Sequence, residues 1–198
     1  MSIFLFSVNF DLFAQKCKPD ILTVDKITKK KYTAWTSELY ETGMGEVIFA
    51  GSTATLHVTL IIGTEQDAAF VQLISKKAES SKQNANYNSQ LKGSKGNEFM
   101  LGLKEGEPLI FSATDVENVS KVGGINELVT TISYVTYITN EQLPLIIESL
   151  SSKTIDAFRI KFDNDVVIEK SVKEKDGEKM KVKASCFKNY LKDKGQLK

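Results

Sequence analysis

Two long segments of this chain alternate residue types with the two-residue period of a β-strand. Residues 53–62 carry an aliphatic side chain at every even position, and residues 128–138 repeat the pattern with β-branched and aromatic side chains. Because successive strand side chains point to opposite faces, each segment is predicted to be a strand with one buried face. Shorter strand signals occupy residues 32–35, 46–50, 69–75, 99–103, 109–111, 155–162 and 166–170.

Late in the chain the period changes to that of a helix. Apolar residues form a helical stripe from Leu143 to Leu150, and Thr139 and Gln142 have the spacing of an N-terminal capping box. With the cap at Thr139, Pro144 would fall inside the helix and disturb its first turn. A second helical stripe consists of Met180, Ala184, Phe187 and Leu191. We therefore expect an α+β fold with a mainly antiparallel β-sheet of about seven to nine strands and two late helices.

The first residues have features of an export signal. An apolar stretch, Ile3 to Phe13, runs into Ala14-Gln15 and is shorter than the roughly 20 apolar residues of a membrane span. We predict that residues 1–15 are a signal peptide or its remnant, and that residues 16–198 form a single β-rich domain. Asp11 and the lack of a basic residue before Phe13 leave an alternative open, in which this stretch is a first buried strand.

The chain has two cysteines, Cys17 and Cys186. In a periplasmic or secreted protein they are expected to form one disulfide bond that joins the two ends of the domain. The alternative is a pair of separate buried thiols in a cytosolic protein.

The charge balance argues against a general affinity for polyanions. The formal net charge is +1, and Arg159 is the single arginine, whereas bidentate recognition of phosphate relies on arginine. We expect no nucleic-acid partner and no transmembrane span. The oligomeric state stays open.

Residues 76–97 form a low-complexity stretch rich in Ser, Asn, Gln, Lys and Gly. A segment with so few apolar side chains cannot bury enough surface to order itself, so we predict a flexible insertion here. Long loops often carry function, which makes this segment a candidate for recognition.

His57 is the only histidine and lies on the threonine-rich face of the strand predicted at 53–62. It could act as a general base beside a hydroxyl group, but no serine has the context of a nucleophile, so an exposed strand histidine is the favoured interpretation. A single histidine also excludes the common multi-histidine zinc sites. We expect no catalytic, cofactor-binding or metal-ligating residue and no cofactor.

Three further motifs have ordinary structural explanations. Asp163-Asn164-Asp165 lacks the glycine and glutamate of a calcium loop and predicts a hairpin turn. Asn118-Val119-Ser120 matches a glycosylation triplet that matters only in a eukaryotic secretory pathway. An aromatic ligand platform or, more commonly, core packing would explain Tyr134, Tyr137, Phe158 and Phe162.

Several short motifs together carry a resemblance. The Phe13-Ala14-Gln15 end of the leader, the Asp25–Lys30 turn, the Thr139–Leu143 segment and the two cysteines resemble a loose group of exported, uncharacterised proteins from Bacteroidota. The resemblance covers most of the mature chain and implies a periplasmic or secreted β-rich domain. It supplies no activity, cofactor or catalytic residue.

These observations favour a non-enzymatic binding or structural module of the cell envelope, with an envelope protein or glycan as its partner. Two alternatives stay open. One is a hydrolase whose site is assembled by the fold around His57. The other is a small-ligand carrier, which a closed barrel with an apolar interior would favour.

Overall fold

The computed structural model describes residues 17–24, 26, 28–42, 53–80, 91–122 and 127–197. The predicted signal peptide at 1–15 and the predicted extended segment at 46–50 lie outside these ranges. The fold is α+β and mainly antiparallel, as predicted, with ten strands and two helices among the described residues. The strand count is one above the upper end of the expected range.

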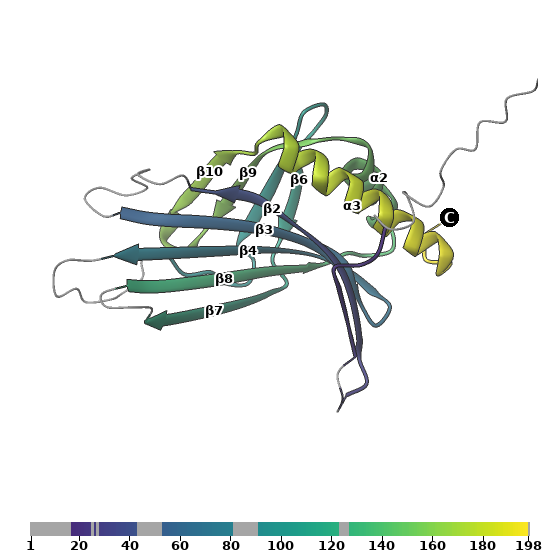
Figure 1. The fold of residues 1–198 in the computed structure, drawn as a ribbon, viewed down its shortest axis with the longest axis horizontal. Coiled ribbons are helices and arrows are strands. Elements are labelled where there is room, and N and C mark those ends of the chain that lie inside the picture. The colour runs from purple at the N-terminus through teal and green to yellow at the C-terminus, as the bar shows by residue number, and fades with distance from the viewer. Residues whose placement is uncertain are drawn as a thin grey trace, which may run out of the picture.

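Six strands form the larger sheet, in the order β1-β2-β3-β4-β8-β7 (Figure 1). Every neighbouring pair in it is antiparallel. The strands are β1 (Ile21–Val24), β2 (Lys31–Glu41), β3 (Thr53–Glu65), β4 (Ala68–Ser80), β7 (Asp115–Val122) and β8 (Glu127–Tyr137).

A smaller sheet of four antiparallel strands has the order β10-β9-β5-β6. Its strands are β5 (Glu98–Leu103), β6 (Leu109–Ser112), β9 (Ile155–Lys161) and β10 (Val167–Ser171). The predicted hairpin turn between β9 and β10 is confirmed as a short 3-10 turn, Asp163–Asp165, in which Asp165 has a φ of 58°.

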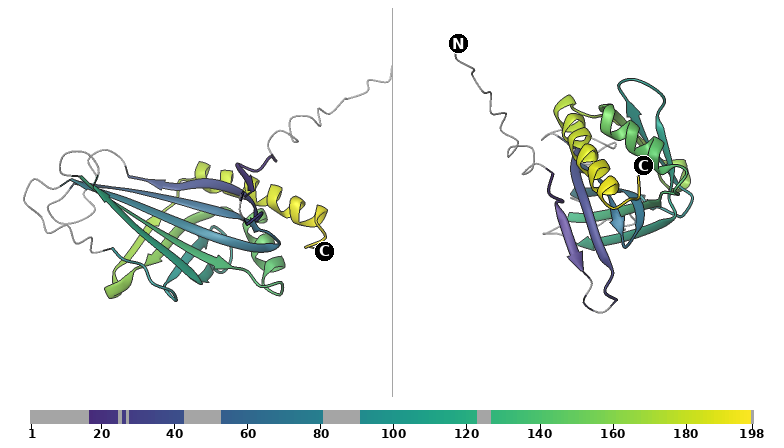
Figure 2. Two further views of the ribbon diagram at one scale, coloured as in Figure 1. Left: turned by 90° about the horizontal axis from the view of Figure 1, so that it is seen from below. Right: turned by 90° about the vertical axis from the view of Figure 1, so that its right-hand side faces the viewer.

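The two sheets lie one over the other, and the helices pack at one end of this pair of sheets (Figure 2). The helices are α2 (Leu143–Ser152) and α3 (Glu174–Asp193). Helix α3 contacts α2, β2 and β9, so it touches both sheets. Gly177 permits this approach, because a Cβ atom at that position would lie well inside contact distance of the Ile155 carbonyl oxygen. None of the described helices is long and apolar enough to span a membrane.

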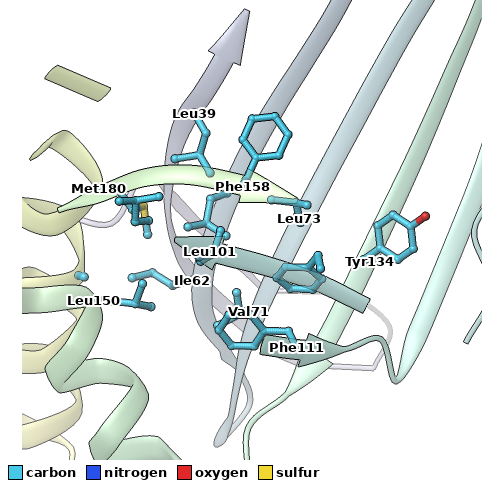
Figure 3. Packing of buried hydrophobic residues seen from close by; sticks show 14 of the residues in the cluster. Leu39, Ile62, Val71, Leu73, Leu101, Phe111, Tyr134, Leu150, Phe158 and Met180 are labelled. Atoms are coloured by element: carbon cyan, nitrogen blue, oxygen red, sulfur yellow. The ribbon is translucent and has the colours of Figure 1, made fainter. Parts of the chain in front are cut away.

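One hydrophobic core joins both sheets and both helices (Figure 3). Leu56, Val58, Leu60 and Ile62 of β3 point into it, as the alternation predicted, and so does the apolar stripe of α3. Fully buried aromatic side chains from different elements fill the interior, among them Trp35, Phe99, Tyr134 and Phe158. The described strands make two separate sheets and not one closed barrel, so the feature that would favour a small-ligand carrier is missing from this part of the chain.

A β-bulge interrupts the pairing of β2 with β3. Glu38 pairs with Thr59 while Tyr40 pairs with Val58, so Leu39 is the extra residue on β2. Leu39 is buried and Tyr40 packs against the same core, although consecutive strand residues normally face opposite sides. The bulge therefore shifts the alternation by one position along the rest of β2.

Two predictions about chain segments need correction. The low-complexity stretch is structured at both ends, because residues 76–80 belong to β4 and Leu91 is buried in the core. Helix α2 begins at Leu143 and not after a cap at Thr139, which puts Pro144 in the first helical turn. An N–H there has no acceptor within the helix, so the proline costs no hydrogen bond. The predicted contact between Thr139 and Gln142 is still present, because Thr139 Oγ1 accepts the Gln142 N–H at 3.4 Å, and the Thr139 carbonyl accepts the Leu143 N–H at 2.9 Å.

The two cysteines are adjacent in space. The sulfur atoms of Cys17 and Cys186 lie 2.21 Å apart and their Cα atoms 4.9 Å apart, which is disulfide distance. Close by, Asp20 accepts hydrogen bonds from the Thr36 backbone N–H (2.7 Å) and from Lys183 Nζ (2.8 Å). The first described segment is thus held against both β2 and α3.

Candidate functional site

A hollow of about 300 Å³ lies on the outer face of the four-stranded sheet. Its floor is low because Gly102 and Ala157, which pair across β5 and β9, have almost no side chain. Pro108 lines the same hollow from the segment before β6. We call this depression the outer-face hollow.

A ridge of three side chains bounds the outer-face hollow on one side. Met100 on β5, Arg159 on β9 and Glu169 on β10 are successive cross-strand partners, and all three line the hollow. Arg159 donates to the Glu169 carboxylate through Nε (2.7 Å) and forms an ion pair with it through Nη2 (2.6 Å). Its Nη1 lies 4.0 Å from the Met100 sulfur. The ridge therefore places the guanidinium group between the Glu169 carboxylate and the Met100 sulfur at the edge of the hollow.

A second hollow, of about 260 Å³, shares Met100 and Arg159 with the first. Its other lining residues are Glu98, Lys161, Asp165 and Val167. By strand register, Glu98 and Val167 lie on the opposite side of the ridge from Gly102 and Ala157. Across the outer face, a small apolar depression is therefore followed by the paired Arg159 and then by a more polar depression.

Exposed apolar side chains stand beside these hollows. Ile110, the cross-strand partner of Met100, is 58% exposed, and Val167 is 51% exposed. Apolar side chains that face solvent within a rim of charged ones mark surfaces that bind other molecules. The outer face of the four-stranded sheet is therefore the best candidate for a recognition surface in the described structure.

His57 lies elsewhere, on the outer face of the six-stranded sheet. Its Nδ1 is 3.3 Å from Glu38 Oε1 and 3.7 Å from Glu41 Oε1. A pocket that joins His57 to an acidic residue would favour the hydrolase hypothesis, and the fold does bring Glu38 and Glu41 to the imidazole. None of the hollows found among the described residues is lined by His57, so the acidic contact is present without the pocket.

The remaining motifs are explained by packing and hydrogen bonding. Tyr134, Phe158 and Phe162 are buried in the core, so they form no exposed ligand platform. Burial raises the pKa of the Tyr134 hydroxyl. The Asn118 amide accepts from the Gly93 N–H (2.8 Å) and donates to the Gly93 carbonyl (2.9 Å), which ties the segment before β5 to β7.

Tyr137 belongs to a separate polar group at the end of β8. Its hydroxyl donates to Glu65 (2.6 Å), and Lys30 donates to the other oxygen of that carboxylate (3.0 Å). The hydrogen bond to Glu65, followed by burial, raises the pKa of Tyr137 to about 12, while the two donors hold the pKa of Glu65 below its ordinary value. The group links the ends of β3 and β8 to the segment before β2.

Comparison of the chain with protein-family models, with curated proteins and with solved structures finds no match.

Proposed function

We propose that this protein is a non-enzymatic binding module that works in the periplasm or outside the cell, and that the outer-face hollow receives an apolar side chain of a partner protein. The observation that carries the proposal is the hollow itself, an apolar depression of about 300 Å³ beside exposed Ile110 and a fixed Arg159–Glu169 pair. An apolar centre with a polar rim is the usual anatomy of a protein interface.

The chemistry of the lining favours a protein over a glycan or a small molecule. Gly102, Ala157 and Phe158 line the hollow, and the Phe158 ring is buried, so the lining offers no exposed aromatic ring for stacking. The volume is at the lower end of the range for small-molecule sites, which begins at about 300 Å³. Charged residues of both signs along the ridge would orient a partner whose flanking residues are also charged.

The cysteines support the proposed compartment. Disulfide bonds persist in oxidising compartments, and Cys17 and Cys186 lie at disulfide distance. The resemblance of the leader and of the cysteine positions to exported proteins supports the same location. Both cysteines are then used for structure, which leaves the binding surface as the functional part.

Lysine-directed crosslinking of the full chain in its native envelope tests the proposal. Lys161 lines the second hollow, and we expect it to be a crosslinked site. Ala157→Arg should fill the outer-face hollow and lower the yield through Lys161 at least about tenfold, because hot-spot contacts are often worth 2 kcal/mol or more. Val182→Arg, at an exposed position on α3, is the matched control and should leave that yield unchanged.

Thermal unfolding of both variants checks that they fold. If folded Ala157→Arg protein crosslinks through Lys161 as well as the parent protein does, the outer-face hollow is not the recognition surface. The same conclusion follows if no crosslink forms through Lys161 while lysines of α3, such as Lys179, are captured.

A further inference from the structure

Three potential metal ligands meet on the outer face of the six-stranded sheet because of the bulge in β2. In a regular strand, residues 38 and 41 would face opposite sides. The bulge turns Leu39 and Tyr40 together toward the core, so Glu38 and Glu41 both face outward and both are exposed. Glu41 is the direct cross-strand partner of His57, whose side chain lies on the same outward face. Bulges often serve to re-aim a side chain in this way.

The separations of the ligand atoms suit a tetrahedral metal ion. Zn–N and Zn–O bonds of about 2.0–2.2 Å imply that two ligand atoms around tetrahedral zinc lie roughly 3.4 Å apart. In the structure Nδ1 of His57 lies 3.3 Å from the Glu38 oxygen and 3.7 Å from the Glu41 oxygen. One potential ligand atom from each of the three residues lies within 4.8 Å of the others. Only small side-chain movements are needed to place all three around one ion.

We propose that Glu38, Glu41 and His57 form a binding site for a divalent transition-metal cation, of which Zn²⁺ is the test case. A neutral imidazole and two carboxylates provide one nitrogen and two oxygen ligands with a combined charge of about −2, which a divalent cation neutralises. The side chains are 36% to 61% exposed, so water can occupy the fourth coordination position.

A lysine lies next to the three potential ligands on this face. Lys76 on β4 is the cross-strand partner of His57 on the side away from Glu41, and it is exposed. Its ammonium group repels the cation, but water and salt screen charges between exposed groups. We therefore expect a site of modest affinity that Lys76→Gln should strengthen. This inference concerns a different sheet face from the proposed protein-binding surface, and neither depends on the other.

Zinc titration of the tag-free full chain tests the site. Because His57 is the only histidine, its imidazole gives a single set of ring signals in the NMR spectrum and reports binding at one residue. We expect 1:1 binding in calorimetry and a shift or broadening of these signals in step with the added Zn²⁺. Changes around a metal ligand commonly cost 10–100-fold in affinity, so Glu38→Gln, Glu41→Gln and His57→Asn should each weaken binding at least about tenfold.

The matched control is Glu117→Gln, a carboxylate on β7 at the far side of the same sheet, which should leave the affinity for zinc unchanged. The proposal is overturned if the imidazole signals do not respond to equimolar or tenfold excess Zn²⁺, or if the three variants bind as tightly as the parent protein. The affected side chains are exposed, and equal unfolding temperatures without metal would show that each variant is folded.

Discussion

Breaking the link between Cys17 and Cys186 should lower the free energy of unfolding by several kcal/mol. The two cysteines are separated by 169 positions in the sequence. In the chain-entropy model, opening a loop of that length removes about 5 kcal/mol of stability, and measured losses for native disulfides are typically 2–5 kcal/mol. The lower part of this range applies if the first segment leaves Thr36 and Lys183 after reduction, because the reduced native state then gains conformational entropy. We expect a loss of about 3 kcal/mol.

Urea denaturation of the oxidised and reduced protein measures this effect. With an m value of about 1–3 kcal/mol per M, a loss of 3 kcal/mol lowers the midpoint by roughly 1–3 M. Alkylation followed by mass measurement confirms the state of the thiols, and a Cys17→Ala/Cys186→Ala variant separates loss of the bond from effects of the reductant. A midpoint shift below about 0.3 M at unchanged m would refute the loop argument. Two thiols that react without reductant in the natively produced protein would refute the assignment to an oxidising compartment.

Two further predictions concern close contacts. Gly177→Ala should lower the melting temperature. Overpacking against the Ile155 carbonyl costs about 1–3 kcal/mol, which outweighs the roughly 1 kcal/mol gain in helix propensity. A higher melting temperature would contradict the close approach of α3. Tyr137→Phe should raise the pKa of Glu65 toward its ordinary value, as measured by carboxyl NMR titration. Because the folded pKa of Glu65 is lowered, its contribution to stability is lost as the pH falls through that pKa, and the variant should lose less stability on acidification. An unchanged pKa would mean that the phenol hydrogen bond has no influence.

The strands and helices that could be predicted are those with one buried face, because apolar residues then recur at a regular spacing in the sequence. Leu56, Val58, Leu60 and Ile62 alternate along β3 because their shared face lies on the main core, and the stripe of α3 from Met180 to Leu191 is buried for the same reason. Strand β7 was missed because it is an edge strand with mostly polar side chains. In this strand only Val116 and Val119 are half-buried, so its sequence resembles a loop.

The candidate sites could be predicted less well. The outer-face hollow arises from the pairing of Gly102 with Ala157, two small residues far apart in the sequence whose register no local pattern reveals. The acidic neighbours of His57 depend on a bulge that inserts one residue, and a strict two-residue period would put Glu38 and Glu41 on opposite faces. The proximity of Cys17 and Cys186 was predicted from their number, the expected compartment and the position of Cys186 beside the apolar stripe of the last helix.

The link between the two ends of the domain also determines how it responds to mechanical force. When Cys17 and Cys186 are bonded, tension applied between the first described segment and the C-terminus passes through the two sulfur atoms, and both sheets lie outside the loaded path. Only the last turns of α3 would be pulled free, against the resistance of buried Phe187 and Leu191. After reduction, the same load would fall on the short ladder between β1 and β2, which would open one residue pair at a time.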